Sequence, residues 1–125
     1  MAEAILVGPN IDAGGRLIGD IRQRGIRISA AAWVFDADRD RWKLHIVAPW
    51  PHGPDGNPYR ALTEFFGPRQ TSLRLDDIVA HRPNTRFAEA LTRLGNEAGP
   101  AVRRVNDRYV DGVFFPEATV YGLRV

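Results

Sequence analysis

Apolar residues along the chain recur either at alternate positions or at positions three and four apart. In residues 42–48 (WKLHIVA) the large apolar side chains alternate with Lys43 and His45, and residues 28–35 form a second apolar run with aromatic and small residues. A period of two is typical of a half-buried strand. The polar run 36–41 between the two segments predicts that they form a hairpin.

Three other segments have helical spacing, and each lies between an N-cap residue and a glycine. They start at Asp12, Asn57 and Asn84 and end at Gly25, Gly67 and Gly95, respectively. Aspartate and asparagine are good N-caps, and glycine is favoured just beyond the last turn. These signals predict three helices.

The last part of the chain predicts strands. Residues 78–81 form a short apolar run, and Asp111-Gly112 is a two-residue turn signal within residues 101–124. Pro116 should mark a bulge or an edge, and residues 4–7 could add a short strand. The element order is therefore (β)αββαβαββ. It predicts a single α+β domain over residues 1–125, in which three helices pack on a mostly antiparallel sheet of about five strands with two hairpins.

The first hairpin makes a more detailed prediction. If Phe35 lies opposite Trp42, and Trp33 opposite Leu44, one face is aromatic and belongs to the core. The reverse face then carries small residues and two polar ones: Ala30, Ala32, Val34, Lys43, His45 and Val47. We expect a closely packed helix to cover this face, with Gly15 and Gly19 of the first helix allowing the approach. A shallow site or a dimer surface are the alternatives.

The length, composition and net charge agree with one soluble domain. The chain has 125 residues and no cysteine, which excludes disulfides and thiolate metal sites. Neither a basic signal-peptide start nor a membrane-length apolar run is present, so a cytoplasmic location is expected. The net charge is only +2, and Lys43 is the single lysine among 17 basic residues. We attribute the many arginines to genome composition rather than to nucleic-acid binding.

No catalytic or metal-binding motif is complete. The glycines at 8, 14 and 15 match no phosphate loop, and residues 36–47 lack the glycine and the glutamate of a calcium loop. The two serines, Ser29 and Ser72, are in no nucleophile elbow. His45 and His81 lie on predicted strands and could converge near Asp76 or Asp77, but no local ligand spacing supports a metal. We expect no cofactor, no metal and no catalytic residue.

Residues 48–59 (APWPHGPDGNPY) contain four prolines. Most of this stretch is explained as the end of a strand, a turn and the start of a helix. Trp50 and His52 have no such structural explanation. Prolines would hold these two side chains with little entropy left to lose on binding. The alternative, which we favour, is that Trp50 folds back and caps the core.

A second candidate surface is basic and aromatic. Arg103, Arg104, Arg108 and Tyr109 lie on one predicted strand, as in proteins that hold single-stranded nucleic acid. Aspartates at 107 and 111 dilute the positive charge, and solvated strand charges are the favoured interpretation.

Several spaced motifs carry a resemblance that covers most of the chain. They are Gly15-Arg16-Leu17, Ala31-Ala32-Trp33, residues 42–49, Asp77-Ile78, Pro83-Asn84, Asp111-Gly112 and residues 118–121. Together they resemble small single-domain bacterial proteins of unassigned function. The motifs are structural, so the resemblance implies a bacterial origin and one domain but transfers no active-site residues.

Three functional hypotheses follow. The first is a non-enzymatic binding or accessory protein that contacts a protein partner or a second copy of itself, with Trp50, His52, His45 and Lys43 as binding residues. Exposed apolar side chains, among them one of Phe114 and Phe115, would add to this surface. The second is nucleic-acid binding through Arg103, Arg104, Arg108 and Tyr109. The third is a small hydrolase or metal-dependent enzyme that uses His45, His52 or His81 with an aspartate.

Overall fold

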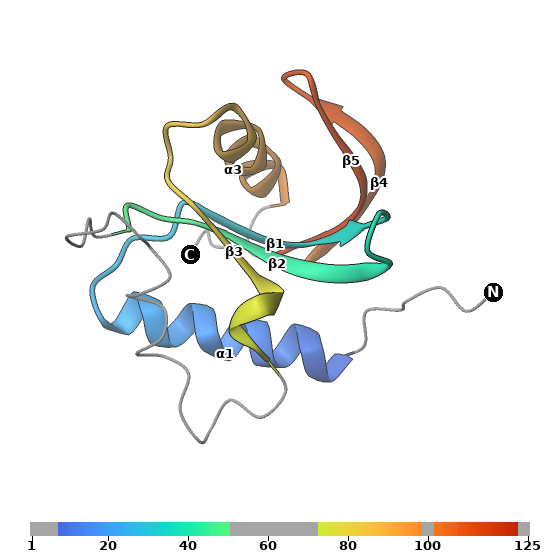
Figure 1. Cartoon of the computed structure of the whole chain (residues 1–125). Coiled ribbons are helices and arrows are strands. Elements are labelled where there is room, and N and C mark those ends of the chain that lie inside the picture. The colour runs from blue at the N-terminus through green and yellow to red at the C-terminus, as the bar shows by residue number, and fades with distance from the viewer. Residues whose placement is uncertain (1–7, 51–72, 99–101, 123–125) are drawn as a thin grey trace.

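The computed structural model describes residues 8–50, 73–98 and 102–122. A five-stranded sheet with the strand order β3-β2-β1-β5-β4 lies between two helices, α1 on one side and α3 on the other (Figure 1). The elements are α1 (Gly8–Gln23), β1 (Ala30–Asp36), β2 (Arg41–Val47), a 3₁₀ turn η2 (Leu75–Asp77), β3 (Ile78–His81), α3 (Arg86–Ala98), β4 (Arg103–Val110) and β5 (Val113–Val120). The predicted α+β class is confirmed.

Two parts of the fold prediction need correction. The sheet is mixed, because β2 and β3 run parallel while the other three neighbouring pairs are antiparallel. The long connection between β2 and β3 allows the chain to cross over and enter β3 in the same direction, which a hairpin could not do. The described residues hold two α-helices instead of three. The helix predicted to start at Asn57 and the strand predicted over 4–7 lie outside them.

The helix α1 ends as predicted but begins earlier. It starts at Gly8, so Asp12 lies within the helix and is not its N-cap. At the other end, Gly25 has a φ of 85°. Its N–H donates to the carbonyl of Arg22 (3.0 Å), and the N–H of Ile26 donates to the carbonyl of Ile21 (3.4 Å). This is a Schellman motif, in which glycine takes the left-handed conformation and stops the helix.

The register predicted for the first hairpin is confirmed. Phe35 pairs with Trp42, Trp33 with Leu44, and Ala31 with Ile46. Asp36 organises the turn, because its carboxylate accepts a hydrogen bond from the N–H of Asp38 (3.1 Å) and pairs with Arg39 (3.0 Å). The segment is therefore a hairpin turn held by an aspartate side chain, as the sequence indicated.

Each face of the sheet has its own core. The aromatic face of the first hairpin packs with α1, and the main contributors are Leu17, Ile21, Trp33, Leu44 and Ile46. The alanine-rich face packs with α3 through Ala30, Ala32, Val47, Leu91 and Leu94. A helix does cover the alanine face, as expected, but it is α3 and not α1 with its Gly15 and Gly19. The glycine at the close approach is Gly95, where an added Cβ would lie 3.9 Å from the Cβ of Ala30.

The start and end of α3 also differ from the prediction. The N-cap is Thr85 and not Asn84, since the Thr85 hydroxyl accepts a hydrogen bond from the N–H of Ala88 (3.1 Å). The helix then runs through Gly95 to Ala98. Burial of its apolar stripe against the sheet outweighs the cost of about 1 kcal/mol that glycine imposes in a helix interior. Glycine at this position serves packing and does not end the helix.

The second hairpin has the predicted Asp111-Gly112 turn. Both residues have positive φ, 50° and 82°, which is typical of the type I′ turn that joins strands with two residues. The ladder runs from Val110↔Val113 outward but omits the pair formed by Asp107 and Pro116. Proline cannot donate to a ladder, and Asp107 has a φ of 47°.

The omitted pair changes which side chains face the core. Val105 and Val110 are both buried in the core beneath α3 although they are an odd number of residues apart, and so are Phe115 and Ala118 on the facing strand. The alternation of inward and outward side chains is therefore interrupted at Asp107 and Pro116, so that residues beyond this pair exchange faces. The half of the hairpin nearer the turn bends up beside α3 (Figure 1). Phe115 is fully buried, whereas Phe114 is 43% exposed. The prediction that these two side chains point to opposite sides is confirmed.

A chain of hydrogen bonds joins distant parts of the sequence on the α1 side. The indole N–H of Trp33 donates to the hydroxyl of Tyr121 (2.9 Å), which in turn donates to the carbonyl of Ile11 in α1. Burial raises the pKa of Tyr121 to about 12, so the hydroxyl keeps its proton.

Neither α1 nor α3 has the length and apolar character that a bilayer crossing requires.

Candidate functional site

The two hairpins separate at one end of the sheet and leave a groove between them. The ladder between β1 and β5 stops at Val34↔Ala118, and beyond this pair the two strands diverge. The space has a volume of about 400 Å³ and is open to solvent. We call it the hairpin groove. Its floor and one wall are formed by Val34, Lys43, His45, Val79, Phe114 and Pro116.

Among the described residues, the hairpin groove carries one positive charge without an ion-pair partner. Asp36 and Arg39 at its end form an ion pair with each other, which also holds the pKa of Asp36 below its usual value. Lys43 forms no ion pair with any part of the chain that the structure describes. The groove therefore has a mixed polar and apolar lining, and its floor carries an ammonium group that pairs with no described carboxylate.

Two aromatic side chains are exposed on the strands that form the wall. Tyr109 is 72% exposed and Phe114 is 43% exposed. They pair across β4 and β5, with ring centroids 4.7 Å apart. Aromatic side chains are enriched at protein interfaces, because they offer a large contact area with few rotatable bonds.

At the groove floor, His45 forms a hydrogen-bonded pair with His81 of the neighbouring strand. The Nδ1 of His45 lies 2.8 Å from the Nε2 of His81. The residues come from neighbouring strands, since His45 pairs with Val79 and His81 pairs with Val47. The predicted convergence of the two histidines is thus present. Phe87 of α3 packs on both imidazoles, at centroid distances of 5.0 and 4.7 Å.

The histidine pair is neutral at physiological pH. Burial lowers the pKa of His45 to about 3, and the nearby His81 and Lys43 add to this effect. Burial also lowers the pKa of His81. One imidazole donates to the other, so neither is a free acid or base of the kind that acid–base catalysis requires near pH 7. The pair supports a structural role and shapes the groove floor.

Asp77, one of the two aspartates considered as partners for the histidines, is paired elsewhere. Asp77 accepts from the guanidinium of Arg41 and from the N–H of Arg74 (3.1 Å). Within residues 8–50, 73–98 and 102–122 no three metal-ligating side chains come together. Two imidazoles alone do not complete the ligand set that zinc requires.

Of the two binding residues predicted in residues 48–59, Trp50 and His52, the structure describes only Trp50. Trp50 is 1% exposed and packs in the core on the α1 side, with its indole N–H directed at the carbonyl of Ile46 (3.4 Å). The favoured interpretation, that Trp50 folds back on the core, is confirmed, and we leave Trp50 out of the proposed site. His52 lies outside the described residues.

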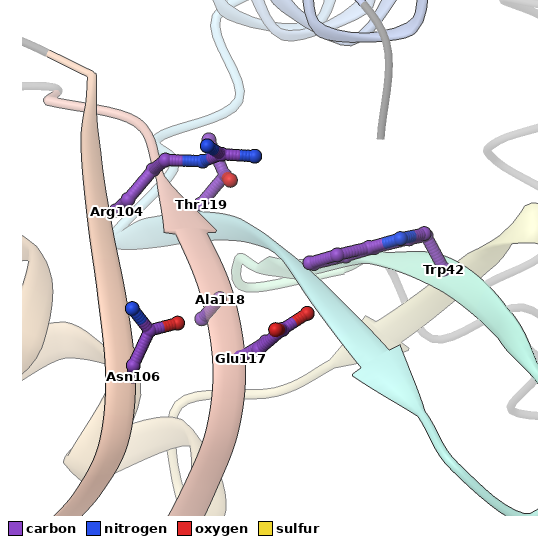
Figure 2. A pocket seen from close by; sticks show the side chains of 6 residues that line it. All are labelled: Trp42, Arg104, Asn106, Glu117, Ala118 and Thr119. Atoms are coloured by element: carbon purple, nitrogen blue, oxygen red, sulfur yellow. The ribbon is translucent and has the colours of Figure 1, made fainter. Parts of the chain in front are cut away.

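The four residues of the basic strand do not form one surface. Arg103 lies on the α3 side, where it donates to the carbonyl of Glu97 (3.5 Å), and Arg108 forms an ion pair with the carboxylate of the same glutamate (2.6 Å). Arg104 extends from the opposite face, over Thr119 (Figure 2). Tyr109 lies beyond the bend and pairs with Phe114. Nucleic-acid binding through these residues stays a prediction.

Neither the contact of Phe87 with the histidines nor the pairing of Arg104 and Asn106 with residues of β5 was predicted from the sequence. The contact of Phe87 with the histidines depends on how α3 crosses the sheet, which the local sequence does not encode. Arg104 and Asn106 face Thr119 and Glu117 across β4 and β5. This arrangement did leave a signal in the sequence, because counting outward from the Asp111-Gly112 turn places these residues opposite each other.

Comparison of the chain with models of protein families, with curated proteins and with solved structures found no match. The resemblance to small bacterial proteins therefore stays a prediction, and functional arguments rest on the geometry alone.

Proposed function

We propose that this protein is a non-enzymatic binding module whose hairpin groove holds an extended segment of a partner protein. The observation that carries the proposal is the separation of β1 from β5 next to an exposed aromatic pair. The two strands stop pairing at Val34↔Ala118, and the groove opens directly beyond. An extended peptide can lie along a strand edge that has lost its neighbour and form main-chain hydrogen bonds with it.

The chemistry of the groove favours a segment with one acidic and one apolar residue. Lys43 supplies a charge that no described carboxylate neutralises. Phe114 and Val34 supply apolar surface in the same groove. A carboxylate of the partner would pair with the ammonium group, and an adjacent apolar side chain would cover the exposed part of Phe114.

The outer edges of the sheet are less suited to binding a strand. The edge strand β3 has only four residues, and β4 carries three arginines and the kink at Asp107. Short strands, charges and kinks are the usual means by which edges avoid pairing with other chains. The internal gap also carries charged residues and Pro116, but it is hollowed into a groove of about 400 Å³ with the exposed Phe114 in its lining.

The test is selection from a library of random linear peptides on the purified protein. We expect enrichment of peptides that combine an acidic with an apolar residue. Lys43→Met and Phe114→Ser should each weaken binding of a selected peptide by roughly tenfold or more, as loss of an interface anchor does. Arg103→Met and Val102→Ser are the matched controls, because they remove one charge and one exposed apolar side chain outside the groove, and they should bind normally.

Two results would contradict the proposal. One is equal loss of binding in the groove variants and their controls, or no enriched peptide at all. The other is a dimer in light scattering that Phe114→Ser dissociates, which would make a second copy of the chain the occupant of the groove.

A further inference from the structure

A second, smaller cavity lies on the other face of the sheet, next to the part covered by α1. Its volume is about 150 Å³, and it is lined by Trp42, Ala118 and four polar residues. We call these four the polar tetrad: Arg104, Asn106, Glu117 and Thr119. Arg104 pairs with Thr119 and Asn106 with Glu117 across the second hairpin, so the tetrad forms two successive rungs on one face.

The tetrad contains a buried hydroxyl group without a partner. Thr119 is 1% exposed, and its Oγ1 makes no hydrogen bond with any residue that the structure describes. Leaving a buried hydroxyl unpaired costs about 1–3 kcal/mol. Valine has nearly the same shape and would avoid this cost. A ligand atom that accepts a hydrogen bond from this hydroxyl would remove the cost.

The charges of the tetrad are held apart. Arg104 and Glu117 lie diagonally across the rungs, but neither forms an ion pair with a described residue. Diagonal neighbours on a sheet have Cα atoms about 7–8 Å apart, and each of these two side chains lines the cavity from its own rung. Figure 2 shows Arg104 reaching over Thr119 on one rung and the carboxylate of Glu117 directed towards Trp42 on the other.

We propose that this cavity binds a free α-amino acid. Its carboxylate would pair with the guanidinium of Arg104 and accept the hydrogen bond of the Thr119 hydroxyl. Its ammonium group would donate to the carboxylate of Glu117 and to the side-chain oxygen of Asn106. The indole of Trp42 forms the apolar wall for the side chain. A zwitterion satisfies both charges at once, which neither a simple anion nor a simple cation does.

The proposal is tested first with the twenty common amino acids at millimolar concentration, using isothermal titration calorimetry on the intact protein. At least one should bind. Its N-acetyl derivative lacks the ammonium group and its amide lacks the carboxylate, and each should bind at least roughly tenfold more weakly, as expected for loss of a charged hydrogen bond. Failure of all twenty to bind, or equal binding of the acetylated form, would overturn the proposal.

Variants then assign the groups. Arg104→Met should no longer distinguish the amino acid from its amide, and Glu117→Gln should no longer distinguish it from its N-acetyl form. Arg103→Met removes the neighbouring arginine on the opposite face and should bind like the wild type. If Arg103→Met and Arg104→Met lose binding equally, the tetrad is not the site.

Thr119→Val separates a binding role from a structural one. Without ligand, the variant should melt at the same temperature as the wild type or higher, because it removes an unpaired buried hydroxyl. It should nevertheless bind the amino acid several-fold more weakly. A variant that melts lower without ligand and binds normally would show that the hydroxyl serves the fold alone, and the proposal would be wrong.

Discussion

Acidification should destabilise the protein through the buried histidine pair. The pKa of His45 is about 3 in the folded protein, against 6.5 in the unfolded chain. As the pH falls, the unfolded chain takes up this proton first, so stability is complete above about pH 6.5 and is lost progressively towards pH 3. At about pH 5 the solution is roughly 1.5 units below the unfolded pKa, which corresponds to about 2 kcal/mol at 1.36 kcal/mol per unit.

Urea unfolding followed by tryptophan fluorescence measures this loss, because Trp33 and Trp50 are buried. The free energy of unfolding should fall by at least about 2 kcal/mol between about pH 7.5 and pH 5, and His81 adds to the loss in the same direction. His45→Gln retains a polar group beside His81 but does not titrate, so its loss over the same range should be smaller by about 2 kcal/mol. An unchanged pH dependence in this variant would refute the argument that burial holds His45 neutral.

Two further predictions concern packing. Trp50→Ala should lower the free energy of unfolding by about 3–5 kcal/mol, as truncation of a buried tryptophan does, and a loss below about 1 kcal/mol would mean that the indole is not in the core. Gly95→Ala should leave stability unchanged or raise it by up to about 1 kcal/mol, since the added Cβ makes ordinary contacts at 3.9 and 4.0 Å. Gly95→Leu should lower it by about 1–3 kcal/mol, because the larger side chain would push α3 away from Ala30. Both are measured by urea unfolding, and equal stability of the two variants at position 95 would contradict the close approach.

The parts of the fold that could be predicted from the sequence depend on local signals. The first hairpin followed from alternation plus a polar turn, and its register was right down to Phe35 opposite Trp42. The second followed from Asp111-Gly112, where both residues adopt the positive φ that such a turn requires. The end of α1 at Gly25 was predictable for the same reason, because backbone geometry there is decided by one residue.

The errors arose where distant parts of the chain decide the structure. The direction of β3 depends on a long crossover, and the residues of β3 themselves do not encode it. Gly95 has the local character of a helix end, yet packing against Ala30 and Val120 keeps it inside α3. Thr85 and Asn84 are both good caps, and the choice between them depends on where the helix meets the sheet.

The candidate sites likewise contain some features that local sequence signals predict and others that depend on contacts between distant parts of the chain. His45 and Lys43 could be placed on one face from alternation alone, and the approach of His81 followed from strand assignments. The hairpin groove could not be predicted, because it exists only where β1 and β5 separate, and this separation accompanies the bend at Asp107 and Pro116. The polar tetrad was predictable in principle, since the turn sets the register of all four residues.

The hydrogen bonds around Tyr121 have a consequence for how the chain folds during synthesis. The hydroxyl of Tyr121 holds the carbonyl of Ile11, 110 residues away in the sequence. The ribosome releases α1 well before Tyr121. The helix must therefore wait until β5 and Tyr121 have been made before it can dock fully, and contacts of such long sequence separation slow folding. Loss of the Tyr121 side chain would thus be felt at α1, far away in the sequence.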